Sequence, residues 1–201
     1  RNMPYRNQYF ALRHGRSVAN ETGVIISHPE NGISAYGLTE TGQRETAAAL
    51  QPEKIAHFGL HVDTVLCYSS DFLRAIETAQ IFCDLNGFAE PIIDTRLRER
   101  FFGDLEKGTD ADYAIIWEQD DRSPTHNHAG CESTARVQAR LRAFIDDCER
   151  DFTDRQIVIV SHGDPLQILQ TIFHNLRPNQ HRTLPHLHNA ELRLLNKDNQ
   201  V

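Results

Sequence analysis

No stretch of this sequence is long and apolar enough to cross a bilayer, which takes roughly 20 consecutive apolar residues. The N-terminal residues RNMPYRNQ also lack the apolar core of a signal peptide. These two absences argue against a membrane protein, and we expect no membrane partner. A cytoplasmic location is the resulting expectation.

Cysteine is scarce, and the four cysteines that occur are widely separated in the chain. They are Cys67, Cys83, Cys131 and Cys148, and none belongs to a Cys-x-x-Cys pair. This spacing argues against a disulfide framework or a zinc site built on thiolates. We therefore predict four buried free thiols in a reducing compartment.

Positive charge is also in short supply, with 21 Lys and Arg against 28 Asp and Glu and a net charge of -7. Proteins that bind nucleic acid normally carry a basic surface to neutralise phosphates, so we expect no nucleic-acid partner. Any phosphate that this protein handles must then be small and bound in a local pocket. The chain of 201 residues, 39% of them hydrophobic, is long enough for one good core and short for two. This predicts a single domain over residues 1–201.

What the sequence does contain is an alternation of short apolar runs and amphipathic segments. The apolar runs predict strands over residues 8–12, 63–70, 91–97, 156–162 and 190–196. Segments with helical period predict helices over residues 38–50, 71–87, 110–119, 132–152 and 164–173. We expect Thr39 to cap the first of these helices and Asn86-Gly87 to end the second. Strands that alternate with helices are typical of an α/β domain with a mostly parallel sheet flanked by helices.

Two of the predicted strands end in a histidine followed by a glycine, at His14-Gly15 and His162-Gly163. Ligands of parallel sheets bind beyond the carboxyl ends of the strands, so both imidazoles reach the same edge if the strands are neighbours. A single histidine could merely close a strand, but two in the same context indicate a function. One neutral imidazole can attack phosphorus as a nucleophile, and a second, protonated imidazole can hold the phosphoryl oxygens.

Several side chains near this edge could bind an anion. A phosphoryl group in transfer needs more than one cation, because its charge spreads over the equatorial oxygens. Arg13 precedes the first histidine, and Arg74 lies just past the strand predicted over residues 63–70. Arg74 could equally be a solvated helix residue, and Asn20, which could donate its amide, fits a turn equally well. Arg16 is close enough in sequence to contribute, but a solvated side chain fits it as well.

A departing alcohol needs a proton, and two carboxyl groups are candidates to supply it. Glu99 follows the strand predicted over residues 91–97. A carboxyl group in a closed pocket can hold its proton to near neutral pH and act as a general acid. Asp164 directly follows His162-Gly163, but Pro165 behind it is typical of a helix N-terminus with proline at the first position. We therefore favour Glu99 as the acid and interpret Asp164 as an N-cap.

Six segments in chain order, spread over nearly the whole sequence, now point to a family. They are LRHGRSVAN, YGLTETGQRE, SSDFLRAIETA, LRERFFGDLEKG, CESTARVQARLRAF and VSHGDPLQ. In these segments the sequence resembles the histidine phosphatase superfamily, in its phosphoglycerate-mutase-like group. The resemblance implies a three-layer α/β sandwich with a mostly parallel central sheet, and it implies that neither a metal nor another cofactor takes part.

The resemblance also implies roles for individual residues. It makes His14 the residue that becomes phosphohistidine and Glu99 the proton donor. The phosphate pocket that it implies consists of Arg13, Arg74 and His162, and the further residues that it places along the substrate are Asn20, Arg100 and Gly163. Asn189 resembles a late asparagine of the family near that pocket.

Two positions depart from the pattern of the family. Arg16 stands where relatives commonly have an acidic or amide residue, so we count it among the substrate-binding residues and expect it to favour a more anionic substrate. Asp164 stands where many relatives have a small residue, and it could modify the proton supply. The acid-phosphatase branch has its acid directly after the second histidine. Gly163 intervenes here, so Glu99 stays the predicted acid.

The reaction that the sequence favours is hydrolysis of a small phosphorylated metabolite by a phosphomonoester phosphatase. Mutases of the glycolytic group carry a longer insertion between the positions of Glu99 and His162, and a shorter cover leaves water a freer path to the phosphoenzyme. A cofactor-dependent phosphoglycerate mutase and a sugar bisphosphatase remain alternatives. A catalytically silent phospholigand-binding protein is the remaining alternative, and the joint presence of all five predicted catalytic residues argues against it.

Two histidine pairs bear on a metal-dependent alternative. His126 and His128 form one pair, and His186 and His188 form the other. Such pairs can bind zinc, but both occur in polar, proline-containing stretches that predict loops. We therefore expect no metal site. The sequence specifies neither the substrate nor the oligomeric state, and a homo-oligomer stays an open alternative.

Overall fold

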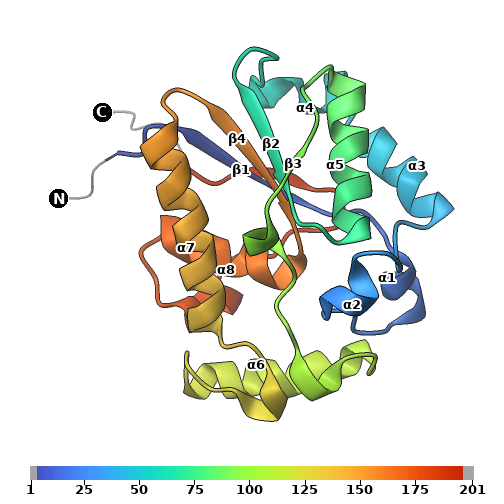
Figure 1. Cartoon of the computed structure of the whole chain (residues 1–201), viewed down its shortest axis with the longest axis vertical. Coiled ribbons are helices and arrows are strands. Elements are labelled where there is room, and N and C mark those ends of the chain that lie inside the picture. Colours follow the sequence, from blue (N-terminus) through green and yellow to red (C-terminus); the bar gives the residue numbers. More distant parts are fainter. Residues whose placement is uncertain (1–3, 197–201) are drawn as a thin grey trace.

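A five-stranded sheet runs through the centre of the computed structural model, which describes residues 4–196 (Figure 1). In spatial order the strands are β3 (Ile92–Ile93), β2 (Val65–Ser69), β4 (Gln156–Ser161), β1 (Gln8–Arg13) and β5 (Leu192–Leu194). All neighbours are parallel except β5, which runs antiparallel to β1. Every residue of the central strand β4 is buried, as expected for a parallel strand covered on both faces. The predicted, mostly parallel sheet is confirmed.

Eight α-helices and six short 3₁₀ segments connect these strands within the described residues. The α-helices are α1 (Val18–Thr22), α2 (Pro29–Gly32), α3 (Glu40–Ala49), α4 (Pro52–Ile55), α5 (Leu73–Asn86), α6 (Tyr113–Arg122), α7 (Thr134–Asp151) and α8 (Gly163–Phe173). The 3₁₀ segments are η1 (Ala56–Phe58), η2 (Thr95–Leu97), η3 (Gly103–Leu105), η4 (Asp110–Asp112), η5 (His128–Gly130) and η6 (Pro178–Thr183).

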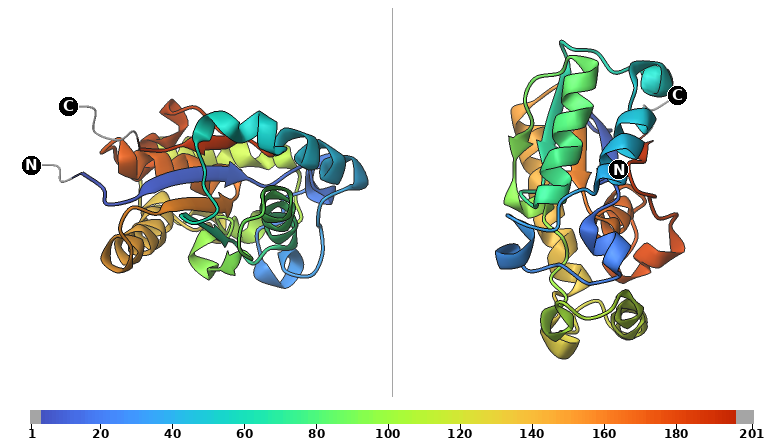
Figure 2. Two further views of the ribbon diagram at one scale, coloured as in Figure 1. Left: turned by 90° about the horizontal axis from the view of Figure 1, so that it is seen from above. Right: turned by 90° about the vertical axis from the view of Figure 1, so that its right-hand side faces the viewer.

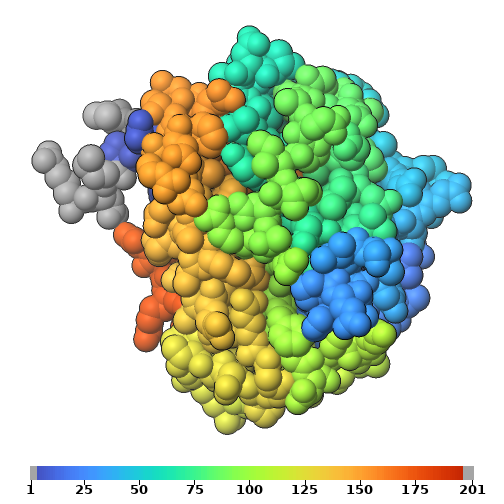
Figure 3. All heavy atoms as spheres, in the orientation of Figure 1, coloured from blue at the N-terminus to red at the C-terminus, as the bar shows by residue number. Residues whose placement is uncertain are grey.

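The helices form a layer on each face of the sheet, as Figure 2 shows. Side chains alternate along a strand, so Tyr9 and Ala11 of β1 face one layer while Phe10 and Leu12 face the other. The first pair packs with apolar residues of α7 and α8. The second pair packs with residues of α5 and with the segment that carries α4. The three-layer sandwich is therefore confirmed. In the space-filling view, helices and connecting segments cover most of the sheet on the face shown (Figure 3).

Local signals set several of the helix ends. Thr39 caps α3 as predicted, because its hydroxyl accepts a hydrogen bond from the backbone N–H of Gly42 at 2.9 Å. Gly87 ends α5 in the left-handed conformation with φ +70°. The strand predicted over residues 91–97 is wrong beyond Ile93, because Asp94 accepts a hydrogen bond from the backbone of Arg96 and turns the chain into η2.

A small separate layer lies beyond the carboxyl ends of the parallel strands. There α6 crosses the lower end of the molecule in Figure 1. A cluster of Ile25, Phe102, Ile116 and Cys131 holds this layer to the loops that follow the strands. The helix predicted over residues 110–119 instead begins at Tyr113, after the 3₁₀ turn η4. This layer closes one side of the space in which the two His-Gly pairs end.

Three further predictions concern the cysteines, a membrane span and the number of domains. The four cysteines are buried and free, as predicted. Within residues 4–196, no helix combines the length and the apolarity that a membrane span requires. The prediction of one domain over residues 1–201 includes residues 1–3 and 197–201, which lie outside the described part, and it stays a prediction.

Candidate active site

The register of β1 and β4 brings the two histidines together. Arg13 is paired with Ser161 at the ends of these adjacent parallel strands, so the next residue of each strand is a histidine at the same edge. The backbone N–H of His14 donates to the carbonyl of Ser161 at 3.1 Å, and the ring centroids of His14 and His162 lie 5.2 Å apart. The predicted meeting of the two imidazoles at one edge is therefore seen in the structure.

A short hydrogen bond fixes the tautomer of His14. Its Nδ1 lies 2.7 Å from the carbonyl oxygen of Gly15, and a carbonyl oxygen can only accept, so Nδ1 carries the proton. The other nitrogen, Nε2, then has a free lone pair. Burial lowers the pKa of His14 well below its ordinary value, and the charges of Arg74 and Arg13 lower it further. The imidazole is neutral at physiological pH, as a nucleophile requires.

Gly15 permits a close approach that a larger residue would block, and Gly163 permits a tight contact with the side chain of Arg13. A Cβ at Gly15 would collide with the hydroxyl of Thr46. A Cβ at Gly163, the first residue of α8, would lie 3.3 Å from the Cζ of Arg13. Both glycines therefore let the backbone pack tightly around the histidines and the first arginine.

His162 is held at one nitrogen and unpartnered at the other. Its Nε2 lies 2.9 Å from the hydroxyl of Ser70, while its buried Nδ1 has no hydrogen-bond partner and lies 3.9 Å from Oε2 of Glu99. Burial, followed by the charge of Arg74, lowers the pKa of His162 well below its ordinary value. The imidazole is therefore neutral here, contrary to the protonated form expected from the sequence. A phosphate dianion beside it would act in the opposite direction and favour the proton.

Two arginines, the buried Arg74 and the half-buried Arg13, each have a buried N–H group without a partner, and both line the same cavity. Nη2 of Arg74 donates to the carbonyl of Ile26 at 2.8 Å, but its buried Nη1 has no partner. Nη1 of Arg13 donates to the carbonyl of Leu187 at 2.8 Å, but its buried Nε has none. Burial lowers the pKa of both arginines, and the nearby carboxyl group of Glu99 offsets part of this effect. Buried donors without acceptors are rare, and these fit an anion.

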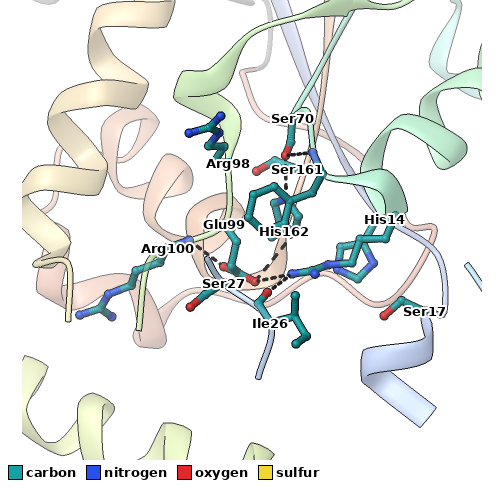
Figure 4. A network of polar contacts seen from close by, with 12 residues as sticks. His14, Ser17, Ile26, Ser27, Ser70, Arg98, Glu99, Arg100, Ser161 and His162 are labelled. Atoms are coloured by element: carbon teal, nitrogen blue, oxygen red, sulfur yellow. Dashed lines mark hydrogen bonds and ion pairs between the residues drawn. The ribbon is translucent and has the colours of Figure 1, made fainter. Parts of the chain in front are cut away.

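In the view of Figure 4, Glu99 and His14 lie on opposite sides of His162. Its Oε1 accepts a hydrogen bond from the backbone of Arg100 at 2.9 Å, and its Oε2 lies 3.5 Å from Nη2 of Arg74. Burial raises the pKa of Glu99 to about 7, against a lowering effect of Arg74 and with a further raising effect of Asp164. Glu99 can therefore hold a proton near neutral pH, where an ordinary glutamate is ionised.

The remaining predicted residues divide into those that line this site and those that do not. Asn20 lines it, and its Oδ1 accepts hydrogen bonds from the backbone of Ser17 and from Nδ2 of Asn189, which leaves its own Nδ2 as a donor. Asn189 also donates to the carbonyl of His14 at 3.0 Å, so it braces the loop that carries the nucleophile. Arg16 instead points to solvent and pairs with Glu45 at 3.1 Å. The structure therefore does not support substrate contact by Arg16.

Arg100 and Asp164 correct two expectations. The guanidinium of Arg100 is fully buried and pairs with Asp120 at 2.7 Å and with Asp164 at 2.9 Å. Figure 4 shows it pointing away from both histidines, so it does not line the site as predicted. Asp164 is not the N-cap of α8, because the helix begins one residue earlier with His162 in the cap position. Its carboxylate turns inward and also accepts from Trp117 and His181.

A cavity of about 430 Å³ contains the site and extends beyond it. The part next to α6 and η6 is lined by side chains that the sequence analysis missed, namely Asp110, Tyr113, Trp117, Gln167 and Arg182. No local motif marks Tyr113, Trp117 or Arg182, because only the folding of α6 and η6 over the strand ends brings them there. Gln167 lies at the end of the segment VSHGDPLQ, but nothing in that segment singles it out. His186, noted above as half of a histidine pair, also lines this cavity. Within residues 4–196, no group of three or more His, Cys, Asp or Glu residues is arranged to hold a metal ion.

A family model agrees with this geometry over nearly the whole chain. The model of the histidine phosphatase superfamily (branch 1) matches residues 9–200. The chain belongs to this superfamily. The family predicted from the six sequence segments is confirmed, and all of the predicted catalytic residues lie within the part of the chain that the model matches.

Individual relatives agree with this assignment to the histidine phosphatase superfamily. A probable phosphoglycerate mutase of Yersinia enterocolitica is 31% identical over 88% of this chain and 79% of its own length. A glucosyl-3-phosphoglycerate phosphatase of Mycolicibacterium vanbaalenii is 30% identical over 76% of this chain and 67% of its own length. The solved structure of a mycobacterial glucosyl-3-phosphoglycerate phosphatase superposes with a TM-score of 0.73, at 26% identity over 92% of this chain and 88% of that one. The family model and the phosphatases among these relatives confirm the predicted enzyme class, a phosphatase of this superfamily.

Proposed function

We propose that this protein is a phosphomonoester hydrolase that works through a phosphohistidine at His14 and needs no metal ion. One observation above all supports this function. The lone pair of His14 Nε2 lies in a cavity whose buried walls carry unpaired N–H groups of Arg13 and Arg74. These two guanidinium groups supply the positive charge that a phosphoryl group in transfer requires.

The geometry supports a reaction in two steps. In the first step, Nε2 of His14 bonds to phosphorus while the bond from phosphorus to the alcohol oxygen breaks, and Glu99 gives its proton to that oxygen. The Nδ1–H of His14 stays on the carbonyl of Gly15, which stabilises the positive charge that the phosphorylated ring acquires. In the second step, a water oxygen bonds to phosphorus while the bond to Nε2 breaks, and the carboxylate of Glu99 takes the proton of that water.

Protonation of Glu99 fits both of its proposed roles. A general acid or base is most effective when its pKa lies near the working pH, and the pKa of Glu99 is raised to about 7. Asp164 is the competing carboxyl group, but its pKa is held well below the ordinary range. Burial alone would raise the pKa of Asp164, yet His181 and Arg100 outweigh burial. Asp164 is therefore ionised and has no proton to give.

Some relatives support hydrolysis, whereas others support transfer of the phosphoryl group to a second substrate. The phosphatases among them share the predicted activity, whereas other relatives are named phosphoglycerate mutases. We propose that water is the main acceptor, since the interval between Glu99 and His162 is short. Incubation with 3-phosphoglycerate and a bisphosphate primer should release phosphate with little 2-phosphoglycerate. Isomerisation that outruns hydrolysis would make the mutase the correct assignment.

The predicted phosphoenzyme can be trapped directly. Purified protein in excess chelator should hydrolyse p-nitrophenyl phosphate, and brief reaction with labelled substrate should leave an acid-labile, base-stable label on the protein. His14→Ala should abolish the label, because the attacking nitrogen is gone. His57→Ala, at an exposed histidine, is the matched control and should keep it. Label that persists in His14→Ala, or activity that vanishes in chelator and returns with added zinc or magnesium, would contradict the proposal.

We also propose a cytoplasmic location and a small phosphorylated substrate as the only partner that the reaction needs. The free state of all four buried thiols supports a reducing compartment. His14 lines a cavity of about 430 Å³ together with Arg13, Arg74 and Glu99, which supports a small substrate, since cavities of about 300–1,000 Å³ typically bind small molecules.

A further inference from the structure

The cavity that holds His14 has a second cationic feature, far from the two arginines of the phosphate site in sequence. Arg182, on η6, lies over the ring of Trp117, on α6, with its Cζ 3.5 Å from the ring centroid. Both residues line the cavity. A guanidinium that stacks face-on against an aromatic ring keeps its N–H edges free to bind an oxyanion.

Unlike most arginines of this chain, Arg182 has no acidic partner among the described residues. No hydrogen bond or ion pair of its guanidinium occurs within residues 4–196, and its side chain is exposed. Long cationic side chains on a surface usually lack a fixed position, because holding one costs side-chain entropy. Here the ring of Trp117 holds the guanidinium in place at no cost to its hydrogen-bonding capacity.

Trp117, on which Arg182 stacks, is itself held in place by its neighbours. The indole Nε1 of Trp117 donates to Oδ1 of Asp164 at 3.3 Å, and the ring stacks on Tyr113 with centroids 5.5 Å apart. His181, the residue before Arg182, is buried and its Nε2 lies 3.1 Å from the same oxygen of Asp164. One carboxylate oxygen therefore anchors both the aromatic ring and the turn that carries the arginine.

We propose that Arg182 on Trp117 forms a second anion subsite, so that the preferred substrate is a phosphomonoester whose alcohol part carries another oxyanion. This inference rests on the proposed function, because it specifies the alcohol that leaves phosphorus when His14 attacks. The shared chemistry of the second group is a carboxylate or a second phosphate. Asp110 lines the same cavity and disfavours an anion at its own position, which directs the second oxyanion to Arg182.

Matched substrate pairs test the subsite and separate the two kinds of oxyanion. One pair is 3-phosphoglycerate and glycerol 3-phosphate, and the other is fructose 1,6-bisphosphate and fructose 6-phosphate. In at least one pair, the wild type should have the higher kcat/KM for the member with the extra anion. Arg182→Ala should reduce that preference about ten- to a hundredfold, the range for hydrogen bonds to a charged group. The pair that responds identifies the carboxylate or the phosphate.

Two further variants separate binding from structure. Arg136→Ala removes an exposed arginine that lines a different cavity, and it should leave the preference as in the wild type. Arg182→Lys keeps the charge but loses the flat, stacked guanidinium, and it should keep only part of the preference. An equal loss on both members of each pair in Arg182→Ala would overturn the subsite, as would a wild type without any preference. If the wild type hydrolyses none of the four substrates and forms no phosphoenzyme, the proposed function fails as well.

Discussion

Arg74 and Arg100 are both buried arginines within a short distance of Glu99 in the fold, yet their surroundings differ in kind. Arg100 donates to two aspartates, Asp120 and Asp164, and to a backbone carbonyl. Within residues 4–196, the guanidinium of Arg74 donates to one carbonyl and to one carboxyl oxygen at 3.5 Å, and its Nη1 has no hydrogen-bond partner. Burial opposes the charge of both. At Arg100 the aspartates outweigh burial and raise the pKa, whereas at Arg74 burial prevails and lowers it.

This difference distinguishes Arg100, which stabilises the fold, from Arg74, which is available to bind a substrate. A buried ion pair with satisfied hydrogen bonds leaves nothing for a ligand to gain. A buried cation without its full set of acceptors stores an unfavourable desolvation that a dianionic phosphate can relieve. Arg100 is directly beside Glu99 in the sequence, but Asp120 and Asp164 already neutralise the charge of Arg100. Arg74 is farther from Glu99 in the sequence, but its guanidinium is the one available for catalysis.

The largest expected effect in this comparison is a loss of stability in Arg100→Met. The substitution leaves Asp120 and Asp164 without the cation that both require, and breaking a buried pair on one side costs about 3–5 kcal/mol. Urea denaturation would measure the loss. Arg44→Met, on an exposed pair with Glu40, is the control and should leave the midpoint unchanged. Wild-type stability in Arg100→Met would remove the distinction between the two arginines.

Arg74→Met should show the reverse pattern, with activity lost and stability kept. Removing one donor from a preorganised anion site typically lowers the rate by about 10²–10³-fold. We expect kcat/KM for p-nitrophenyl phosphate to fall by this factor, while the urea midpoint stays the same or rises. Arg98→Met, at an arginine paired with Asp71, provides the neighbouring control. A strongly destabilised Arg74→Met with little kinetic defect would assign Arg74 to the fold instead.

A smaller effect concerns the pH dependence of stability at Glu99. Its pKa is about 7 in the folded protein and 4.5 in its ordinary state, so between these values the folded chain binds more protons than the unfolded chain. Stability attributable to this group therefore falls as pH rises through that window, with a slope of at most about 1.4 kcal/mol per pH unit. Glu99→Gln removes the slope, so its stability relative to the wild type should increase from pH 5 to pH 8.

Glu106 provides the matched control for that experiment, because its pKa shifts the other way. Burial alone would raise the pKa of Glu106, but hydrogen bonds from Asn31, His28 and Ser27 outweigh burial and lower it. Its stabilising contribution is present above the ordinary pKa and is lost only as the pH falls through the lowered value. Glu106→Gln should therefore lose stability by a constant amount from pH 5 to pH 8. A constant difference in Glu99→Gln as well would contradict a raised pKa at Glu99.

The sequence is sufficient to predict the two histidines at the strand ends, but not the side chains of α6 and η6 that line the rest of the cavity. His14 and His162 were predictable because each follows a short apolar strand and precedes a glycine, and parallel strands deliver their ends to one edge. Glu99 was expected just after a strand, but that strand ends at Ile93, so the family resemblance is what predicted the place of Glu99 correctly. Trp117 and Arg182 were not predictable, because they lie on α6 and η6 and meet only when both pack over Asp164.

Errors of the sequence analysis also have a common physical cause. Asp164 before proline is typical of an N-cap, yet donors on Arg100, Trp117 and His181 draw its carboxylate away from the helix end. Arg100 lies next to Glu99 in sequence, but successive residues of an extended segment point to opposite sides. Local patterns specify the backbone well. They do not reveal which charges tertiary packing has already paired.

The order of strands in the sheet has a consequence for the biosynthesis of this enzyme. The central strand β4 stands between β1 and β2, and within the described sheet β1 has only β4 and β5 as neighbours. In a growing chain β2 and β3 can pair early, but nothing joins β1, with Arg13 and His14, to that pair until β4 emerges from the ribosome. Such distant pairing makes folding slow relative to local structures, because loop closure must precede any gain from the contacts. The nucleophile and its anion-binding partners thus become competent together, late in synthesis, in a single assembly event.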